Sequence, residues 1–131
     1  MPASLYIVAT PIGHLDDMSL RAIDVLRSVN LIAAEDTRHS SKLMRHFDIR
    51  TPLISYHDHS ESSDLEGMLK RLRAGETIAL ISDAGTPLVS DPGYKLVVAC
   101  HQERIPVVPI PGASATITAL SAAGLPTDRF Y

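Results

Sequence analysis

The sequence predicts an α/β domain built on a mainly parallel sheet of about five strands, with helices on both faces. Short runs of β-branched and apolar residues, each bounded by turn formers, recur along the chain. Segments with the apolar spacing of amphipathic helices lie between them. The strand runs are continuously apolar, which is typical of strands covered on both faces, and their alternation with helices is typical of a parallel sheet.

The expected strands span 5–9, 31–34, 52–56, 77–81 and 106–110. Apolar residues at 22, 25, 26 and 29 mark the first helix, and those at 65, 68, 69 and 72 mark another. Ser63 and Glu66 have capping-box spacing at the start of that second helix, and Gly75 stands where its left-handed C-terminal residue belongs. Asp91 and Pro92 suit the cap and first position of a further helix.

The composition indicates one soluble globular domain of 131 residues, with 45% hydrophobic and 21% charged residues. A net charge of −3 gives no general attraction to nucleic acid, so any RNA contact must depend on a local basic patch or on parts outside this chain. Cys100 is the single cysteine, which excludes an internal disulfide and fits a reducing cytoplasm. We expect no signal peptide and no membrane helix. An uncharged helix over 113–123 is expected to be buried, at a homodimer interface.

Three of the expected strands end in similar loops, at 9–13, 82–87 and 110–114. Each loop combines proline, glycine and a small hydroxylic residue, and the second continues to Tyr94 through Gly93. Because parallel strands all end at one edge of the sheet, the three loops can build a cleft lined mainly by backbone N–H and C=O groups. The alternative for each loop is a tight structural turn.

The sequence lacks the usual phosphate cradles. No G-x-G-x-x-G follows the first strand, and no G-x-x-x-x-G-K is present. A ligand with an adenosine, a carboxylate and an amine but no phosphate suits loops poor in lysine and arginine. S-adenosylmethionine is such a ligand.

Five ordered motifs carry a family resemblance over the whole chain. They are LYIVATPIG at 5–13, AEDTRH at 34–39, SYHDH at 55–59, SDAGTPLVSDPGY at 82–94, and VPIPGAS at 108–114 with GLP at 124–126. The chain resembles the 16S ribosomal RNA cytidine 2′-O-methyltransferases, a branch of the tetrapyrrole (corrin/porphyrin) methylase superfamily. The resemblance implies methyl transfer from S-adenosylmethionine to a ribose 2′-hydroxyl in the decoding region. It also implies that residues 1–131 are the N-terminal domain, and that a second α/β domain, absent from this chain, completes the cofactor cleft.

The resemblance assigns the cofactor to positions in the three loops. These are Pro11, Gly13, Ser82, Asp83, Ala84, Gly85, Thr86, Pro111, Gly112, Ala113, Ser114 and Ala115. His14 departs from the family pattern, which usually carries asparagine there. This exchange replaces a small amide with a titratable ring.

Asp36, Arg38 and His57 are the candidate catalytic residues. Asp36 and Arg38 follow the second strand and therefore fall on the same sheet edge as the cofactor loops, where they could accept a proton and hold a ribose or phosphate. The alternative is a helix-capping Asp36 beside a solvent-facing Arg38. His57 is a candidate proton acceptor or RNA contact, with a hydrogen-bonded structural histidine as the alternative. His57 and His59 share one face of an extended segment, but no third ligand is evident, so no metal is predicted.

Arg38, Lys42 and Arg45 fall on one helical face and are the candidate RNA-binding residues. A solvated helix face is the alternative. The expected partner is 16S rRNA of the small ribosomal subunit, with no DNA or membrane partner, for a cytoplasmic homodimer. Two other functions remain open, a tetrapyrrole methyltransferase and a non-enzymatic nucleotide-sensing module.

Overall fold

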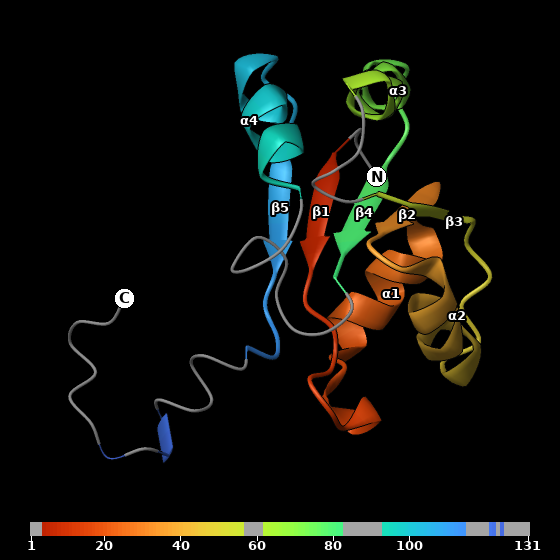
Figure 1. The fold of residues 1–131 in the computed structure, drawn as a ribbon, viewed down its shortest axis with the longest axis vertical. Coiled ribbons are helices and arrows are strands. Elements are labelled where there is room, and N and C mark those ends of the chain that lie inside the picture. The colour runs from red at the N-terminus through yellow and green to blue at the C-terminus, as the bar shows by residue number, and fades with distance from the viewer. Residues whose placement is uncertain (1–3, 57–61, 83–92, 115–120, 123, 125–131) are drawn as a thin grey trace.

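The computed structural model describes residues 4–56, 62–82, 93–114, 121–122 and 124. Its five strands are β1 (Leu5–Val8), β2 (Leu31–Ala34), β3 (Leu53–Ser55), β4 (Ile78–Ile81) and β5 (Val107–Ile110). They form one sheet in the order β3-β2-β4-β1-β5, and every neighbouring pair is parallel (Figure 1). The predicted parallel α/β class is confirmed, and each strand lies within its predicted range.

Four α-helices and a short 3-10 helix connect the strands. They are η1 (Leu15–Asp17), α1 (Leu20–Ser28), α2 (Thr37–His46), α3 (Ser62–Arg73) and α4 (Tyr94–Gln102). The chain runs outward from β1 to β3 through α1 and α2, then returns through α3 and α4 to β4 and β5. Because such crossovers are right-handed, reversing the direction moves the helices to the opposite face of the sheet. Accordingly α1 and α2 lie together, away from α3 and α4 (Figure 1).

The three central strands β1, β2 and β4 are buried on both faces, whereas the edge strands β3 and β5 are partly exposed. Successive residues of a central strand contribute to two different cores. Val8 packs into the cluster that contains Leu26 of α1, whereas Ile7 packs into the cluster that contains Leu96 of α4. Cys100 is fully buried in the second cluster, and burial raises the pKa of its thiol to about 11. The two cores explain why the strand sequences are continuously apolar rather than alternating.

Some helix ends lie where the sequence predicts them, and others do not. Gly75 has φ 95°, and the N–H of Glu76 donates to the carbonyl of Arg71 at 3.1 Å, as expected for a helix C-terminus. The prediction that α4 begins at Pro92 is wrong: Gly93 is its N-cap with φ 106°, a left-handed conformation, and the helix begins at Tyr94. Side chains 62–64 and most of the helix predicted over 113–123 lie outside the described residues.

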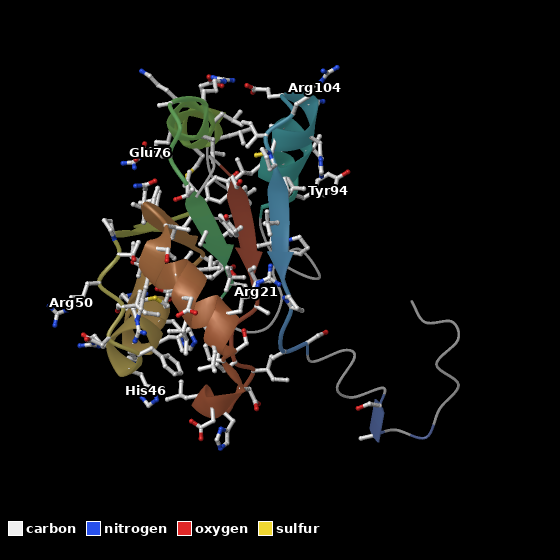
Figure 2. All side chains as sticks on the ribbon, turned by 180° about the vertical axis from the view of Figure 1, so that it is seen from behind. Arg21, His46, Arg50, Glu76, Tyr94 and Arg104 are labelled. Carbon is white, nitrogen blue, oxygen red and sulfur yellow. The ribbon has the colours of Figure 1, made fainter. Side chains whose placement is uncertain are left out.

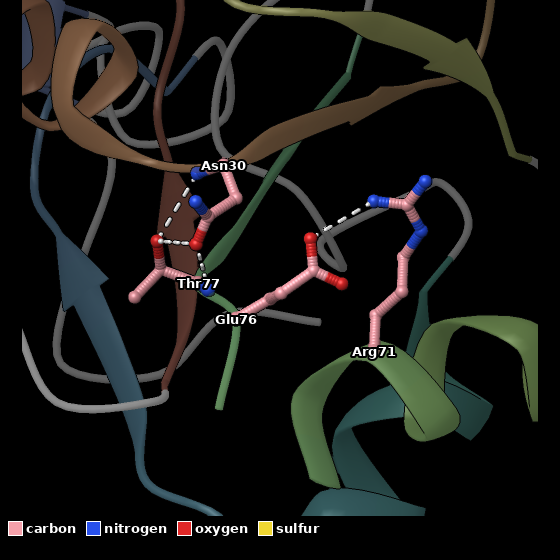
Figure 3. Close-up of polar contacts among 4 residues, drawn as sticks. All are labelled: Asn30, Arg71, Glu76 and Thr77. Atoms are coloured by element: carbon pink, nitrogen blue, oxygen red, sulfur yellow. Dashed lines mark hydrogen bonds and ion pairs between the residues drawn. The ribbon is translucent and has the colours of Figure 1, made fainter. Parts of the chain in front are cut away.

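A polar cluster joins β2 and β4 at the N-terminal edge of the sheet, opposite the three loops (Figure 3). The backbone N–H of Thr77 donates to Asn30 Oδ1 at 2.8 Å, and the N–H of Asn30 donates to Thr77 Oγ1 at 3.1 Å. Beside it, Arg71 pairs with Glu76 at 3.2 Å. These contacts fix the register of the two strands at the edge away from the candidate site. Within the described ranges, no helix is long and apolar enough to cross a membrane.

Candidate functional site

The strand order brings the ends of β4, β1 and β5 side by side, because β1 lies between the other two. The Thr10 hydroxyl, which is buried, donates to the backbone carbonyl of Ser82 at 3.4 Å. On the other side, the N–H of Ala9 donates to the carbonyl of Ile110 at 3.4 Å. The loop after β1 is therefore hydrogen-bonded to both neighbouring strand ends, and the three loops start from one continuous edge.

Gly112 lies where the loop after β5 comes closest to the end of β1. A Cβ atom at this position would stand 2.8 Å from the Cβ of Ala9, a separation that real Cβ atoms essentially never show. Only a residue without a side chain permits this approach. Gly112 thus lets the loop after β5 lie directly against Ala9 at the end of β1.

The described cofactor candidates divide into buried and accessible positions. Pro11 and Ser82 are buried, whereas Gly13, Pro111 and Gly112 are exposed. Ala113 and Ser114 are half-buried. Asp83, Ala84, Gly85, Thr86 and Ala115 lie outside the described residues, as does the catalytic candidate His57.

Asp36 is the N-cap of α2. Its Oδ1 accepts the backbone N–H of Arg38 at 2.9 Å and lies 3.6 Å from Arg38 Nε. The hydrogen bond from that backbone N–H, together with the Arg38 guanidinium, lowers the pKa of the Asp36 carboxyl below its ordinary value. A carboxylate with a lowered pKa is a weak base, so the geometry suits Asp36 to positioning better than to proton abstraction. The Arg38 side chain is 92% exposed, and this capping arrangement is the alternative that the sequence left open.

An open pocket of about 460 Å³ lies between the loop after β1 and α2, and we call it the β1–α2 pocket. The loop contributes Pro11, Ile12 and Gly13, η1 contributes Leu15, and α2 contributes His39, Lys42, Leu43 and His46. The four helical residues have the i, i+3, i+4, i+7 spacing of one face. His46 lies at the opposite end of the molecule from Arg104, on the side of the strand C-termini (Figure 2).

The three predicted RNA-binding residues do not all line the pocket. Lys42 lines it, whereas Arg38 and Arg45 are exposed elsewhere on α2 and are not among its lining residues. His39 and His46 were not expected as site residues. Their helical spacing from Lys42 could have indicated them, but the facing loop that makes the pocket could not be found from periodicity. Among the described residues, no group of three or more His, Cys, Asp or Glu side chains could hold a metal ion.

Solved structures share this architecture. Uroporphyrin-III-C-methyltransferase from Thermus thermophilus superimposes with a TM-score of 0.71 at 24% identity, covering 94% of this chain and 53% of that one. The cobalt precorrin-4 methyltransferase CbiF superimposes with a TM-score of 0.69 at 18% identity, covering 92% and 50% of the two chains. At these identities the likeness establishes the α/β fold alone.

Sequence comparison gives the family. Residues 4–131 match the tetrapyrrole (corrin/porphyrin) methylases, and the chain belongs to this family. It is 60% identical over 126 residues to ribosomal RNA small subunit methyltransferase I of Synechocystis sp. and 59% identical over 127 residues to that of Pseudomonas aeruginosa. These alignments cover 96% and 97% of this chain and 45% of each relative. The chain thus spans a little under half the length of these curated relatives.

Proposed function

We propose that the complete protein transfers a methyl group from S-adenosylmethionine to the ribose 2′-hydroxyl of a cytidine in the decoding region of 16S rRNA. The observation that carries the proposal is the single edge at which the ends of β4, β1 and β5 meet, with Gly112 packed closely against Ala9. Relatives at 59–60% identity that bear the name ribosomal RNA small subunit methyltransferase I supply the substrate class.

The residues at this edge fit the cofactor. Close approach at Gly112 leaves main-chain N–H and C=O groups to pair with an adenosine, a carboxylate and an amine. Pro11, Gly13, Ser82 and the segment 111–114 would hold the molecule, together with the undescribed positions 83–86 and 115. When bound, S-adenosylmethionine supplies an electrophilic methyl group on a sulfonium.

Positioning of the ribose is the main task left to the protein, because an in-line displacement needs the hydroxyl aligned with the methyl–sulfur bond. The exposed guanidinium of Arg38 would hold a ribose or phosphate oxygen, and Asp36 would fix the first turn of α2 from which Arg38 projects. The lowered pKa of Asp36 leaves His57 as the better candidate to accept the hydroxyl proton.

The proposal includes parts beyond these residues. Since the relatives are more than twice as long, we place residues 1–131 as the N-terminal domain and expect a second domain to close the cofactor cleft. We further propose a homodimer in the cytoplasm. The RNA would be bound as part of the small ribosomal subunit.

The test is methylation of small ribosomal subunits from cells that lack the complete protein. Purified protein and S-adenosylmethionine with a labelled methyl group should yield labelled 2′-O-methylcytidine, identified by mass spectrometry of the digested RNA. Transfer to an offered tetrapyrrole but not to RNA would overturn the proposal in favour of a tetrapyrrole methyltransferase. Failure to bind S-adenosylmethionine would instead favour a nucleotide-sensing module.

A further inference from the structure

The β1–α2 pocket combines two kinds of surface. Its apolar lining comes from Pro11 and Ile12 of the loop, Leu15 of η1 and Leu43 of α2. Lys42, His39 and His46 provide an ammonium group and two imidazoles, and all three residues are exposed. None of the described residues that line it is acidic, although the chain as a whole carries a net charge of −3. A ligand that suits this pocket has a flat apolar part and an anionic part.

The position of the pocket relates it to the strand-end edge. Pro11 and Gly13 line the pocket and also belong to the loop that follows β1, whose start is hydrogen-bonded to the ends of β4 and β5. A ligand in the pocket therefore lies next to the proposed methyl-transfer site. A volume of about 460 Å³ is in the range of small-molecule sites and is sufficient for one nucleotide.

We propose that the β1–α2 pocket holds one unstacked nucleotide of the RNA, a neighbour of the cytidine that is methylated. The base would lie against the apolar walls, its phosphate would pair with the Lys42 ammonium, and the imidazoles would stack on or hydrogen-bond to the base. Proteins read single-stranded RNA in this way, by taking bases out of the stack and holding the backbone with cations. The inference rests on the proposed function, and it names which side chains fix the register of the RNA.

Charge complementarity favours a nucleotide over a protein surface. Lys42 lines the pocket together with two histidines, and none of the described lining residues is a carboxylate that would compete for the ammonium, which suits a phosphate. Arg38 and Arg45 lie on the same helix but outside the pocket, so they can contact adjoining phosphates of the same strand. A second protein chain in the pocket is the competing occupant.

The first experiment measures binding of the complete protein to a fluorescein-labelled single-stranded RNA that carries the target cytidine and its neighbours. Lys42→Ala should weaken binding and reduce the slope of log affinity against log salt by about 0.7, the value for one lost phosphate contact on a single strand. Leu15→Ala should weaken binding roughly fivefold or more without changing that slope. Leu15 is 42% exposed, so its truncation leaves the core intact. Lys70→Ala, an exposed lysine in the last turn of α3, is the matched control and should bind normally.

A second experiment identifies the base. Each oligonucleotide lacks the base at one position. At one nucleotide next to the target cytidine, removal of the base should weaken binding to the wild-type protein but not to Leu15→Ala. If Lys42→Ala and Leu15→Ala bind every RNA like Lys70→Ala, the pocket does not hold a nucleotide, even where the wild type methylates RNA. If either pocket variant changes the oligomeric state of the protein and leaves its RNA affinity unchanged, the pocket is a protein contact and the inference is overturned. If the wild-type protein does not methylate RNA at all, the result contradicts the proposed function, whereas the binding measurements still test the pocket.

Discussion

Gly112 is the residue at which one carbon atom decides how closely two strand ends can lie. A Cβ there meets the buried methyl group of Ala9, the residue directly after β1, rather than the end of a flexible side chain. The loop after β5 must therefore shift to accommodate it. Such a shift moves the backbone groups that we assign to the cofactor. Gly13, Gly67, Gly75 and Gly124 differ from Gly112, because a Cβ built at any of them has no neighbouring atom within 4 Å.

Gly112→Ala should therefore lower the affinity for S-adenosylmethionine in the complete protein and cost about 1–3 kcal/mol of stability, the usual effect of overpacking. Calorimetric titration and thermal unfolding measure the two effects. Gly67→Ala is the control: it lies in α3 with no described atom within 4 Å of a built Cβ, and it should stabilise the helix by about 0.5–1 kcal/mol. Unchanged cofactor affinity in Gly112→Ala would remove this loop from the site.

Asp36 and Arg38 act at the first turn of α2, and their capping arrangement gives a second prediction. Asp36→Ala and Arg38→Ala should each lower turnover by roughly tenfold or more while changing cofactor affinity little, because both affect substrate position. Asp36→Asn keeps a good N-cap but removes the charge, so it should retain helix stability. Steady-state kinetics and cofactor titration separate the effects. Unchanged turnover in both alanine variants would exclude the pair from the chemistry.

At the scale of elements, helices α3 and α4 are joined by an ion-pair cluster. Arg73 of α3 donates from Nε and Nη2 to both carboxylate oxygens of Glu103, at 2.6 and 2.7 Å, and also pairs with Glu66. The bidentate hydrogen bonds lower the pKa of Glu103 and raise that of Arg73. The cluster thus links the last turn of α3 to the C-cap of α4.

Arg73→Ala should lower the melting temperature by a few degrees at neutral pH and by less in acid. A lowered folded-state pKa means that Glu103 contributes stability above its unfolded pKa, and that this contribution is lost as the pH falls through the lowered folded value. Thermal unfolding across this range measures the difference. Arg50→Ala, which breaks the more exposed pair with Asp48, is the control and should have little effect at any pH. A pH-independent difference would show that Arg73 acts by packing alone.

The sequence predicted individual elements better than their arrangement. Strands such as β4 are recognised because continuous apolar residues bounded by turn formers are distinctive. The start of α4 was misplaced because Asp91 and Pro92 resemble a helix start, whereas the left-handed Gly93 determines where the helix begins. The position of His39 opposite the loop after β1 depends on how α2 packs, which no local pattern encodes.

At the scale of the whole molecule, the site depends on the insertion of β1 between β4 and β5. All five strands have similar apolar sequences, so their order could not be predicted from composition or periodicity. The order places loops that are far apart in the chain at one edge, with Thr10 bonded to Ser82 across 72 positions. In an open α/β sheet, ligands bind beyond the carboxyl ends of the strands, and here the ends of β4, β1 and β5 lie together at that edge.

The edge formed by β4, β1 and β5 is one wall of the proposed cleft. This arrangement predicts how residues 1–131 behave when they are produced without the proposed second domain. Calorimetry should find S-adenosylmethionine bound more weakly by residues 1–131 than by the complete chain, because groups on only one side of the ligand are available. The isolated domain should also transfer no methyl group to RNA. Cooperative thermal unfolding of residues 1–131 is the control that the domain is folded, as its two continuous cores lead us to expect. Methylation by residues 1–131 at the rate of the complete protein would contradict the two-domain cleft and leave the edge of β4, β1 and β5 as a sufficient site.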